Sequence, residues 1–413
     1  MEHELEEMYR QLRTLSVFRL LHDDPVFSAF QNMLYYCDPT KQTDDFFDVC
    51  AAEFASELYQ ANTDHWTDYL VRLVLTVKTP CSHFVCIGEP IPAHIEQAAR
   101  RELKLLSKAA AFSSEMAKAQ CPNVRCPLPD WNADLIDLET VYFDRLDHIG
   151  IHGFGEFSLY KMFHMELSDR TDKGYVLEPV AYPDKVQLSD LIGYEMQRTQ
   201  IIDNTRALLA GKKAANTLLY GDAGAGKSAT VKAVANYYSN DGLRLIELSK
   251  NELHLLPRLL EELSANPLKF ILFIDDLSFQ ENDDDFSALK AVLEGSISAR
   301  SNNTVIFATS NRRHIVRETF SQRDGDEIHR NDTMQETISL SERFGIKVYF
   351  EKPNKELYIK IVNGLADQFG LRMDRETLAL EAERFAMRKS GRSARAARQL
   401  VEQIAAKESL HLL

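Results

Sequence analysis

Two patterns of apolar positions divide this chain. Through the first part the apolar residues recur every three or four positions, as at Leu5, Met8, Leu12 and Leu15, which predicts amphipathic helices. Further along, short apolar runs alternate with helical stretches, and beyond residue 350 the pattern is helical throughout. We therefore predict a mainly α-helical amino-terminal domain over residues 1–150, an α/β core over residues 186–351 and a helical segment over residues 352–413.

The α/β region contains five strand candidates, at residues 217–220, 243–247, 270–275, 304–309 and 346–350. Helical stretches fit between them, which predicts a parallel sheet covered on both faces. Two shorter runs, at residues 156–160 and 173–177, are expected to pair as a β-hairpin within a linker over residues 151–185. Prolines at positions 179 and 183 place the domain boundary there. Other expected helices cover residues 95–116, 134–146, 355–369, 374–387 and 393–407.

The most informative run is Gly221-Asp222-Ala223-Gly224-Ala225-Gly226-Lys227-Ser228-Ala229, which joins the first strand of the core to a helical pattern. In that context G-x-x-x-x-G-K-S is a phosphate-binding loop. Its glycines let backbone N–H groups surround an anion, and the helix adds its positive dipole end. Lys227 is expected to reach the β- and γ-phosphates, and Ser228 to bind Mg²⁺. The sequence therefore predicts a nucleoside triphosphate site.

Polar residues follow two other strands of the core. The apolar run 270–274 ends on Asp275 and Asp276, and the run 304–309 continues to Asn311. Asp275 is suited to hold Mg²⁺ through water, and Asp276 to orient or deprotonate the attacking water. If the two strands are neighbours, Asn311 meets the γ-phosphate or its water. Taken alone, a helix cap and an asparagine turn would also explain these residues.

A transferring phosphoryl group requires positive charge near its oxygens. Three clusters of arginines are candidates for this charge: Arg312 and Arg313, then Arg343 within residues 341–345, and finally Arg392, Arg395 and Arg398. The last of these clusters also fits the solvated, basic start of a helix.

Composition limits the range of partners. The 413 residues are 45% hydrophobic and 27% charged, as in an ordinary globular protein, and the length suits more than one domain. The formal net charge of −14 provides no general attraction for nucleic acid or anionic membranes, although a local basic patch remains compatible with either. The acidic amino terminus lacks the features of a signal peptide, and no run is apolar enough to cross a membrane. We expect a cytoplasmic protein.

Six cysteines indicate reduced thiols rather than a disulfide scaffold. Two pairs share one spacing, Cys81-x4-Cys86 and Cys121-x4-Cys126. A four-thiolate zinc site is an alternative, but the usual spacing of such ligands is C-x2-C. Free thiols are the favoured interpretation.

In their order along the chain, these elements resemble the AAA+ ATPases. The resemblance implies a five-stranded parallel P-loop core followed by a helical lid, with ATP and Mg²⁺ as ligands and assembly into a homo-oligomer. It implies Walker A at residues 221–228, Walker B at residues 270–276 and sensor 1 at Asn311. It also implies an arginine finger at Arg343 and a sensor 2 arginine in the lid, with Arg395 preferred to Arg392. Residues 188–195 resemble the segment that covers adenine in clamp-loader and RuvB-like members, which assigns Ile192 and Gly193 to the base.

A narrower resemblance, over about residues 177–404, is to a bacterial family of predicted AAA+ ATPases labelled as a domain of unknown function. The runs at residues 275–279, 308–314 and 339–345 carry it. Three positions depart from the wider AAA+ pattern. Asp276 stands where most members have Glu, which is expected to slow hydrolysis. Ala225 and Ala229 replace frequent hydroxyl residues, and Glu342 stands where Asp is commoner.

Three functions remain open at the level of sequence. The first is an oligomeric ATPase that remodels a macromolecular partner, and the second is a slowly hydrolysing ATP-dependent switch. In both, residues 1–150 are the expected binding region for a protein client. The third is a DNA-processing ATPase of helicase-loader or RuvB-like type, which the net negative charge disfavours. A P-loop kinase is disfavoured, because no acceptor site is evident.

Overall fold

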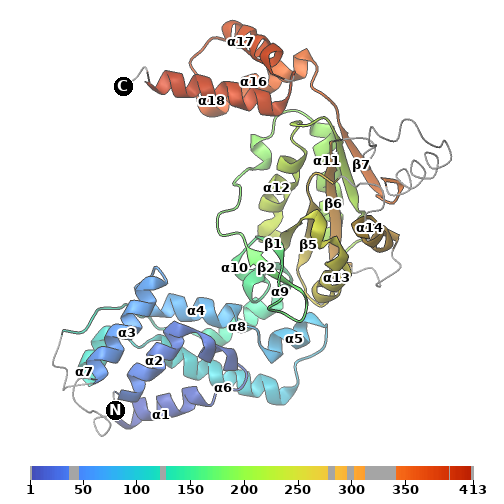
Figure 1. Ribbon diagram of the computed structural model, residues 1–413. Helices are drawn as coiled ribbons and strands as arrows, with labels where there is room; N and C mark the ends of the chain where they lie inside the picture. Colours follow the sequence, from blue (N-terminus) through green and yellow to red (C-terminus); the bar gives the residue numbers. More distant parts are fainter. Residues whose placement is uncertain are drawn as a thin grey trace. The chain divides into compact units, whose positions relative to one another are not determined.

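The structure of the chain is a computed structural model that describes residues 2–36, 46–120, 127–277, 284–294, 302–311, 341–389 and 391–410. The chain divides into two compact units, Met1–Leu159 and Tyr160–Leu413, which we call unit 1 and unit 2 (Figure 1). Four residues singled out in the sequence lie outside the described residues: Arg312, Arg313, Cys121 and Cys126.

Unit 1 is helical, as the spacing of its apolar residues predicts. Its core is rich in aromatic side chains, including Trp66, which packs 4.6 Å from Phe30 between ring centroids. Two of the expected elements differ. The expected helix over residues 95–116 is divided into α6 and α7, and residues 156–159 form a helical turn rather than a strand. The helices are α1 (Glu2–Arg13), α2 (Pro25–Tyr36), α3 (Phe46–Gln60), α4 (Trp66–Thr76), α5 (Pro80–Cys86), α6 (Ala93–Ala110), α7 (Ser114–Gln120), α8 (Leu138–Asp147), α9 (Ile149–His152) and α10 (Glu156–Leu159).

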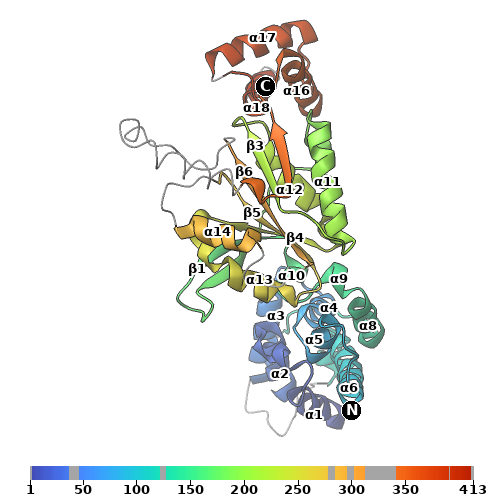
Figure 2. The same cartoon turned by 90° about the vertical axis from the view of Figure 1, so that its right-hand side faces the viewer.

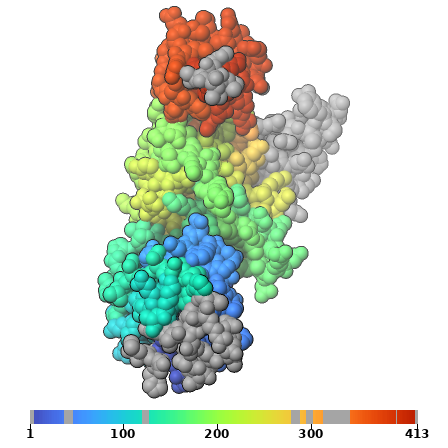
Figure 3. All heavy atoms as spheres, turned by 90° about the vertical axis from the view of Figure 1, so that its left-hand side faces the viewer, coloured from blue at the N-terminus to red at the C-terminus, as the bar shows by residue number. Residues whose placement is uncertain are grey.

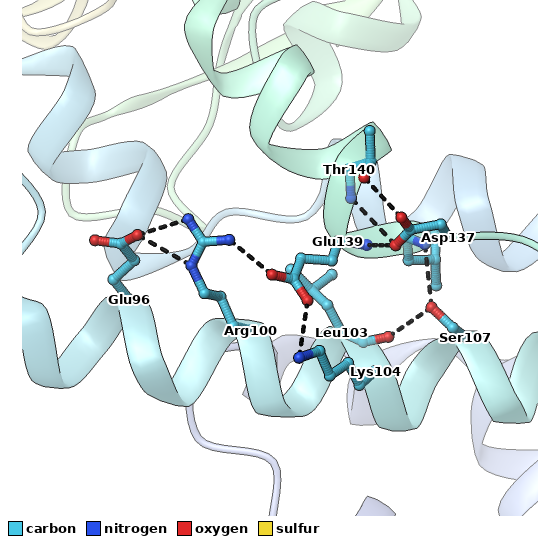
Figure 4. A network of polar contacts seen from close by, with 9 residues as sticks. Glu96, Arg100, Leu103, Lys104, Ser107, Asp137, Glu139 and Thr140 are labelled. Carbon is cyan, nitrogen blue, oxygen red and sulfur yellow. Dashed lines mark hydrogen bonds and ion pairs between the residues drawn. The ribbon is translucent and has the colours of Figure 1, made fainter.

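Polar contacts join α6 to the start of α8 (Figure 4). Arg100 donates hydrogen bonds to Glu96 on its own helix and to Glu139 on α8, both at 2.7 Å. The Ser107 hydroxyl accepts the backbone N–H of Leu138 at 3.0 Å. Because these charged groups are still partly exposed to water, their ion pairs add little stability compared with the apolar core of unit 1.

Unit 2 is built on a seven-stranded sheet, with the order β2-β1-β4-β5-β6-β3-β7. The expected sheet had five strands, and that count is wrong because the hairpin joins the same sheet. The first strand of the hairpin runs over Met162–Leu167 and pairs in parallel with β4. The second strand of the hairpin pairs antiparallel with the first and forms an edge of the sheet. The other five strands are all parallel and match the expected ones to within one residue. The strands are β1 (Met162–Leu167), β2 (Tyr175–Pro179), β3 (Thr217–Gly221), β4 (Leu243–Leu248), β5 (Lys269–Ile274), β6 (Thr304–Ser310) and β7 (Ile346–Phe350).

Helices cover both faces of this sheet (Figures 1 and 2). Alternate strand residues, such as Leu219 and Phe273, belong to one apolar core with α11 and α12. Their neighbours Leu218 and Leu272 are equally buried and point to the opposite face, on the side of α13 and α14. The predicted α/β fold with two covered faces is therefore confirmed. These helices are α11 (Glu195–Leu209), α12 (Lys227–Tyr238), α13 (Leu256–Ser264) and α14 (Asp284–Glu294).

The predicted helical lid consists of α16 (Lys355–Phe369), α17 (Arg375–Arg388) and α18 (Ala394–Leu410). The side chains of Asn354 and Asp374 cap the first two of these helices. The lid's apolar residues continue the core that α11 and α12 share with the sheet. A space-filling view shows the lid, in red and orange, adjoining green segments of unit 2 (Figure 3). Within the described residues, no helix has both the length and the apolar character needed to span a bilayer.

Candidate nucleotide site

The predicted phosphate loop lies at the carboxyl ends of the parallel strands, between β3 and α12. Gly221 has a φ of +134°, and a Cβ there would lie 1.9 Å from the carbonyl oxygen of Phe350, so a side chain is excluded. Gly226 caps α12 with a φ of +94°, which turns the chain from the loop into the helix. The open N-terminus of α12 is thereby aimed at the loop, where it favours an anion.

Lys227, at 6% exposure, is buried beneath this loop. Its ammonium donates to the carbonyl oxygens of Gly221 and Asp222 at 3.0 and 2.8 Å, and to Oδ1 of Asn311 at 3.0 Å. Burial lowers the pKa of Lys227, while the nearby Asp222, Asp276 and Asp275 raise it. Among the described residues, the acceptors of this ammonium are thus neutral oxygens rather than carboxylates. This environment favours an anionic ligand in the loop.

Ser228 and Asp275, the two predicted magnesium ligands, are in contact. The Ser228 hydroxyl donates to Oδ1 of Asp275 at 2.7 Å, and Thr309 donates to the same oxygen at 2.5 Å. Among the described residues no cluster of three or more His, Cys, Asp or Glu side chains forms a metal cage. One hydroxyl and one carboxylate fit Mg²⁺, which usually takes one or two protein ligands together with water and phosphate oxygens.

Asp276 has a φ of +53°, a left-handed conformation that is costly for a residue with a side chain. Its backbone N–H donates to the Thr309 hydroxyl at 2.9 Å, and its carboxylate accepts from Nδ2 of Asn311 at 2.7 Å. Asn311 is adjacent because β5 and β6 are paired, which meets the condition set in the sequence analysis. The two residues predicted to act on water are therefore joined to each other, and through Asn311 to Lys227.

A cavity of about 530 Å³ opens above these residues, within the range of small-ligand sites. One wall is the predicted base-covering segment, which includes Ile192 and Gly193. This segment packs tightly on α16 of the lid. A Cβ on Gly193 would lie 2.6 Å from the side chain of Leu357, and a Cβ on Gly364 would lie 2.6 Å from Ile192. The walls of the cavity thus come from both the sheet and the lid.

The arginines predicted from sequence occupy different places. Arg395 lines the cavity, and its backbone N–H donates to the Gly224 carbonyl at 3.2 Å. Arg392 instead donates two hydrogen bonds to Glu383, at 2.9 and 2.6 Å, and does not line the cavity. Arg343 is also absent from the lining and lies at the amino ends of β3, β6 and β7. The structure thus groups Arg395, but not Arg343, with the phosphate loop of the same chain.

Two other arginines in the cavity lining were not predicted as ligands of the nucleotide. Arg198 on α11 donates to the carbonyl oxygen of Leu191 at 2.7 Å, and burial lowers its pKa. Arg398 follows Arg395 by one turn on α18 and donates to Glu402 at 3.0 Å. In the sequence, Arg398 stands out only as the last member of the third arginine cluster. Arg198 belongs to no sequence motif, and only the fold brings it to the cavity.

The chain matches the family described as "Protein of unknown function (DUF815)" over residues 161–408. The chain belongs to this family. The DUF815 match begins at β1 and extends through most of α18, so it includes the whole sheet, the phosphate loop and the lid cavity. The family match starts before residue 177, which is where the resemblance was expected to begin from the sequence. The earlier start includes the hairpin, which is part of the same sheet. Unit 1 lies outside the DUF815 match.

A search of curated proteins finds no match. Among solved structures, this DUF815 chain is similar to the Thermotoga maritima RuvB Holliday junction branch migration motor, with 15% identity and a TM-score of 0.37. The match covers 52% of this chain and 63% of RuvB. A mutant of the same RuvB matches with 14% identity and a TM-score of 0.39, over 55% of this chain and 67% of that one.

Cys81 and Cys86 are the described members of the two cysteine pairs. Burial raises the pKa of each thiol to about 11, so both remain protonated near neutral pH. Protonated, buried thiols are weak metal ligands. The four-cysteine zinc alternative is not tested, because its other two members lie outside the described residues.

Proposed function

We propose that this chain binds ATP with Mg²⁺ in the cavity between the sheet and the lid, and that it hydrolyses the γ-phosphate. One observation carries the proposal: the buried Lys227 ammonium, the Ser228–Asp275 pair and the Asp276–Asn311 pair converge at the N-terminus of α12. An ammonium, a hydroxyl–carboxylate pair and an acid–amide pair are the groups that phosphoryl transfer to water requires.

Each residue has a distinct part in this proposal. Lys227 binds the phosphate oxygens, together with the backbone N–H groups of the loop. Ser228 and Asp275 hold Mg²⁺, which neutralises charge on the phosphates. Asp276 orients the attacking water and accepts its proton, and Asn311 positions that water. Arg395 approaches from the lid and stabilises negative charge on the phosphates.

The position of Arg343 supports a site that a second copy completes. Arg343 lies beside the start of β3, whereas the phosphate loop follows the end of that strand. Five strand residues separate the two ends by roughly 13 Å, at about 3.3 Å per residue. An arginine at that end serves a neighbouring protomer rather than its own nucleotide. We therefore propose a homo-oligomeric ATPase that remodels a protein client, with unit 1 as the client-binding part.

A slow switch is the second candidate, and a specific observation favours it. The Asp276 carboxylate is engaged by Asn311, and its backbone is held in a left-handed conformation. An acid restrained in this way, and shorter than glutamate, is a poor base until the Asn311 contact is released. Under this candidate ATP binds tightly, turnover is low without a partner, and the bound nucleotide orders the lid.

The proposal is tested by ATP binding and phosphate release in the wild type and in Lys227→Ala. The matched control is Lys232→Ala, on the same helix, because Lys232 lies 3.4 Å from Glu247 and does not line the cavity. We expect Lys227→Ala to weaken ATP binding at least tenfold and the control to bind normally. Equal binding by the wild type and Lys227→Ala would exclude this site as the nucleotide site.

A further inference from the structure

A second cavity, of about 590 Å³, lies at the opposite ends of the strands from the phosphate loop. Its described lining comes from the loop that leads from α11 into β3, the start of β6 and the residues at the start of β7, and also from side chains of α11, α13 and α14. This cavity contains Arg343, but none of the residues of the candidate nucleotide site. It is therefore a separate feature of the same sheet.

Among the described residues that line this cavity, the charged side chains are all of one sign. Lys212, Lys213 and Arg343 all line it, and no carboxylate occurs among its described lining residues. Both lysines are exposed at the rim of the cavity. Such a cluster stands out in a chain whose formal net charge is −14. A concave site with three cations favours an anionic ligand.

The loop that carries the two lysines is firmly held. The Asn204 side chain accepts the N–H of Ala215 at 2.9 Å and donates to its carbonyl at 2.8 Å. Oδ1 of Asn216 accepts the N–H of Ile306 at 2.9 Å, and its backbone carbonyl accepts the N–H of Ile346 at 3.2 Å. These contacts fix the end of the loop to α11, β6 and β7, so the lysines are presented from a rigid base.

Arg343 is fixed beside the same loop. Gly345, two residues further on, approaches Ala215 so closely that a Cβ on the glycine would lie 2.9 Å from the alanine Cβ. Glycine at this position lets the Arg343 segment pack against the lysine loop. The three cations therefore line one cavity from two segments that pack together, and we call them the basic edge: Lys212, Lys213 and Arg343.

We propose that Lys212 and Lys213 enter, together with Arg343, the nucleotide cavity of a second copy of this chain and contact the phosphates bound there. The proposal rests on the ATP site proposed above, and it adds two lysines to that site. The described lining of the nucleotide cavity carries three carboxylates and four cations, so it is bound ATP that supplies the excess negative charge. The basic edge complements that charge, which identifies a nucleotide-loaded second copy as the occupant. The basic edge cannot serve its own nucleotide, since β3 separates them.

In this arrangement the lysines act as fixed positive charges and undergo no chemical change. They neutralise charge on the bound ATP and steer one copy onto the next. Removing them is expected to weaken assembly at moderate ionic strength and to lower turnover. ATP binding to an isolated chain should stay unchanged, because neither lysine lines the cavity in its own chain.

A subunit-mixing experiment tests the proposal with two full-length variants. Lys212→Ala/Lys213→Ala keeps the phosphate loop and loses most of the basic edge, whereas Lys227→Ala keeps the basic edge and loses the phosphate loop. Each variant alone is expected to hydrolyse ATP at least tenfold more slowly than the wild type. When mixed, they should regain a substantial part of the wild-type rate, because intact phosphate loops then meet intact basic edges.

Three controls make the result specific. Lys185→Ala/Lys407→Ala removes two exposed lysines elsewhere in unit 2 and should behave as the wild type. Lys212→Arg/Lys213→Arg should keep most of the activity, because the charge is retained. ATP binding by Lys212→Ala/Lys213→Ala, measured at low protein concentration, should equal that of the wild type, which also excludes misfolding.

Several outcomes would overturn the inference. A Lys212→Ala/Lys213→Ala variant with wild-type turnover at every protein concentration would do so while leaving the proposed ATPase intact. No recovery on mixing would also overturn it. The inference would also fail if Lys212→Ala/Lys213→Ala lost binding to duplex DNA or inorganic phosphate while its ATP turnover stayed at the wild-type level. The ligand of the basic edge would then be a different anion. Failure of the wild type to bind ATP would remove both proposals and is seen before any mixing.

Discussion

Asn311 and Asp276 are joined by a hydrogen bond of 2.7 Å, from the amide nitrogen to a carboxylate oxygen. The oxygen of the same amide accepts the Lys227 ammonium at 3.0 Å. One side chain just after β6 thereby links Lys227 to Asp276, the residues proposed to bind phosphate and to act on water. Under that proposal, a phosphate that draws Lys227 toward itself competes with this amide, and ligand binding is communicated to Asp276.

Replacement of Asn311 by alanine tests this link. We expect Asn311→Ala to lower turnover by about one to two orders of magnitude, because Asp276 and its water lose their positioning partner. ATP affinity should change by less than threefold, since Lys227 keeps its two carbonyl partners. Steady-state kinetics and equilibrium ATP binding separate the two effects. A rise in turnover would contradict this role and would indicate that Asn311 restrains Asp276, as in the switch.

The lowered pKa of Lys227 gives a pH dependence. Phosphate binds the protonated ammonium, so ATP binding is coupled to that proton and is strongest below the pKa of the empty site. As pH rises through this pKa the affinity falls. Because burial lowers the pKa, the fall should begin below the ordinary lysine value of 10.5. ATP binding measured between pH 7 and 10 checks this, and a flat affinity over the range would contradict it.

Arg198 is predicted to be a positioning residue for the base-covering segment. Its guanidinium holds the Leu191 carbonyl, next to Ile192, at 2.7 Å. We expect Arg198→Ala to weaken ATP binding by about tenfold, the value of one charged hydrogen bond, with little change in turnover at saturation. Arg206→Ala is the control, since Arg206 lies on the same helix and outside the cavity. Similar losses in both variants would indicate a general effect on α11.

The contact between Ile192 and Gly364 gives a paired prediction. A Cβ at position 364 would lie 2.6 Å from the Ile192 side chain, so Gly364→Ala must displace that segment or the lid. We expect weaker ATP binding in Gly364→Ala and a partial return in Gly364→Ala/Ile192→Ala, where space is restored. Isothermal titration with ATP distinguishes the variants. If the second change brings no recovery, the contact does not control the site.

Unit 1 contains a buried carboxylate with a structural role. Glu102, at 4% exposure, accepts the backbone N–H groups of Ser16, Val17 and Phe18. Glu102→Ala removes the acceptor of the N–H groups of the buried residues Val17 and Phe18, and we expect it to lower the free energy of unfolding of unit 1 by about 2–4 kcal/mol. Chemical denaturation measures this. ATP affinity should be unaffected, and a stability within about 0.5 kcal/mol of the wild type would contradict the role.

Much of unit 2 was predictable because its central strands are buried on both faces. Such strands are continuous apolar runs, as in residues 270–274, and their limits show directly in sequence. The first strand of the hairpin was misplaced for the opposite reason. Met162–Leu167 has only three buried residues, and its place is fixed by pairing with β4, some eighty residues away in sequence.

The site divides in the same way. Lys227, Ser228, Asp275 and Asn311 belong to local motifs at strand ends, so the sequence predicts them as candidates, and strand pairing brings them together. Arg198 lies on a helix without any motif, and only the packing of α11 brings it to the cavity. The basic edge depends on the adjacency of two segments far apart in the chain, which no spacing rule reveals.

Steady-state ATP turnover per chain, measured over a wide range of protein concentration with Mg²⁺ present, tests the proposed ATPase most directly. We expect a rate that climbs with concentration to a plateau, because a second copy completes each site, and no turnover by Lys227→Ala. A chain that neither binds nor hydrolyses ATP at any concentration would contradict the proposed function. So would a Lys227→Ala variant as active as the wild type.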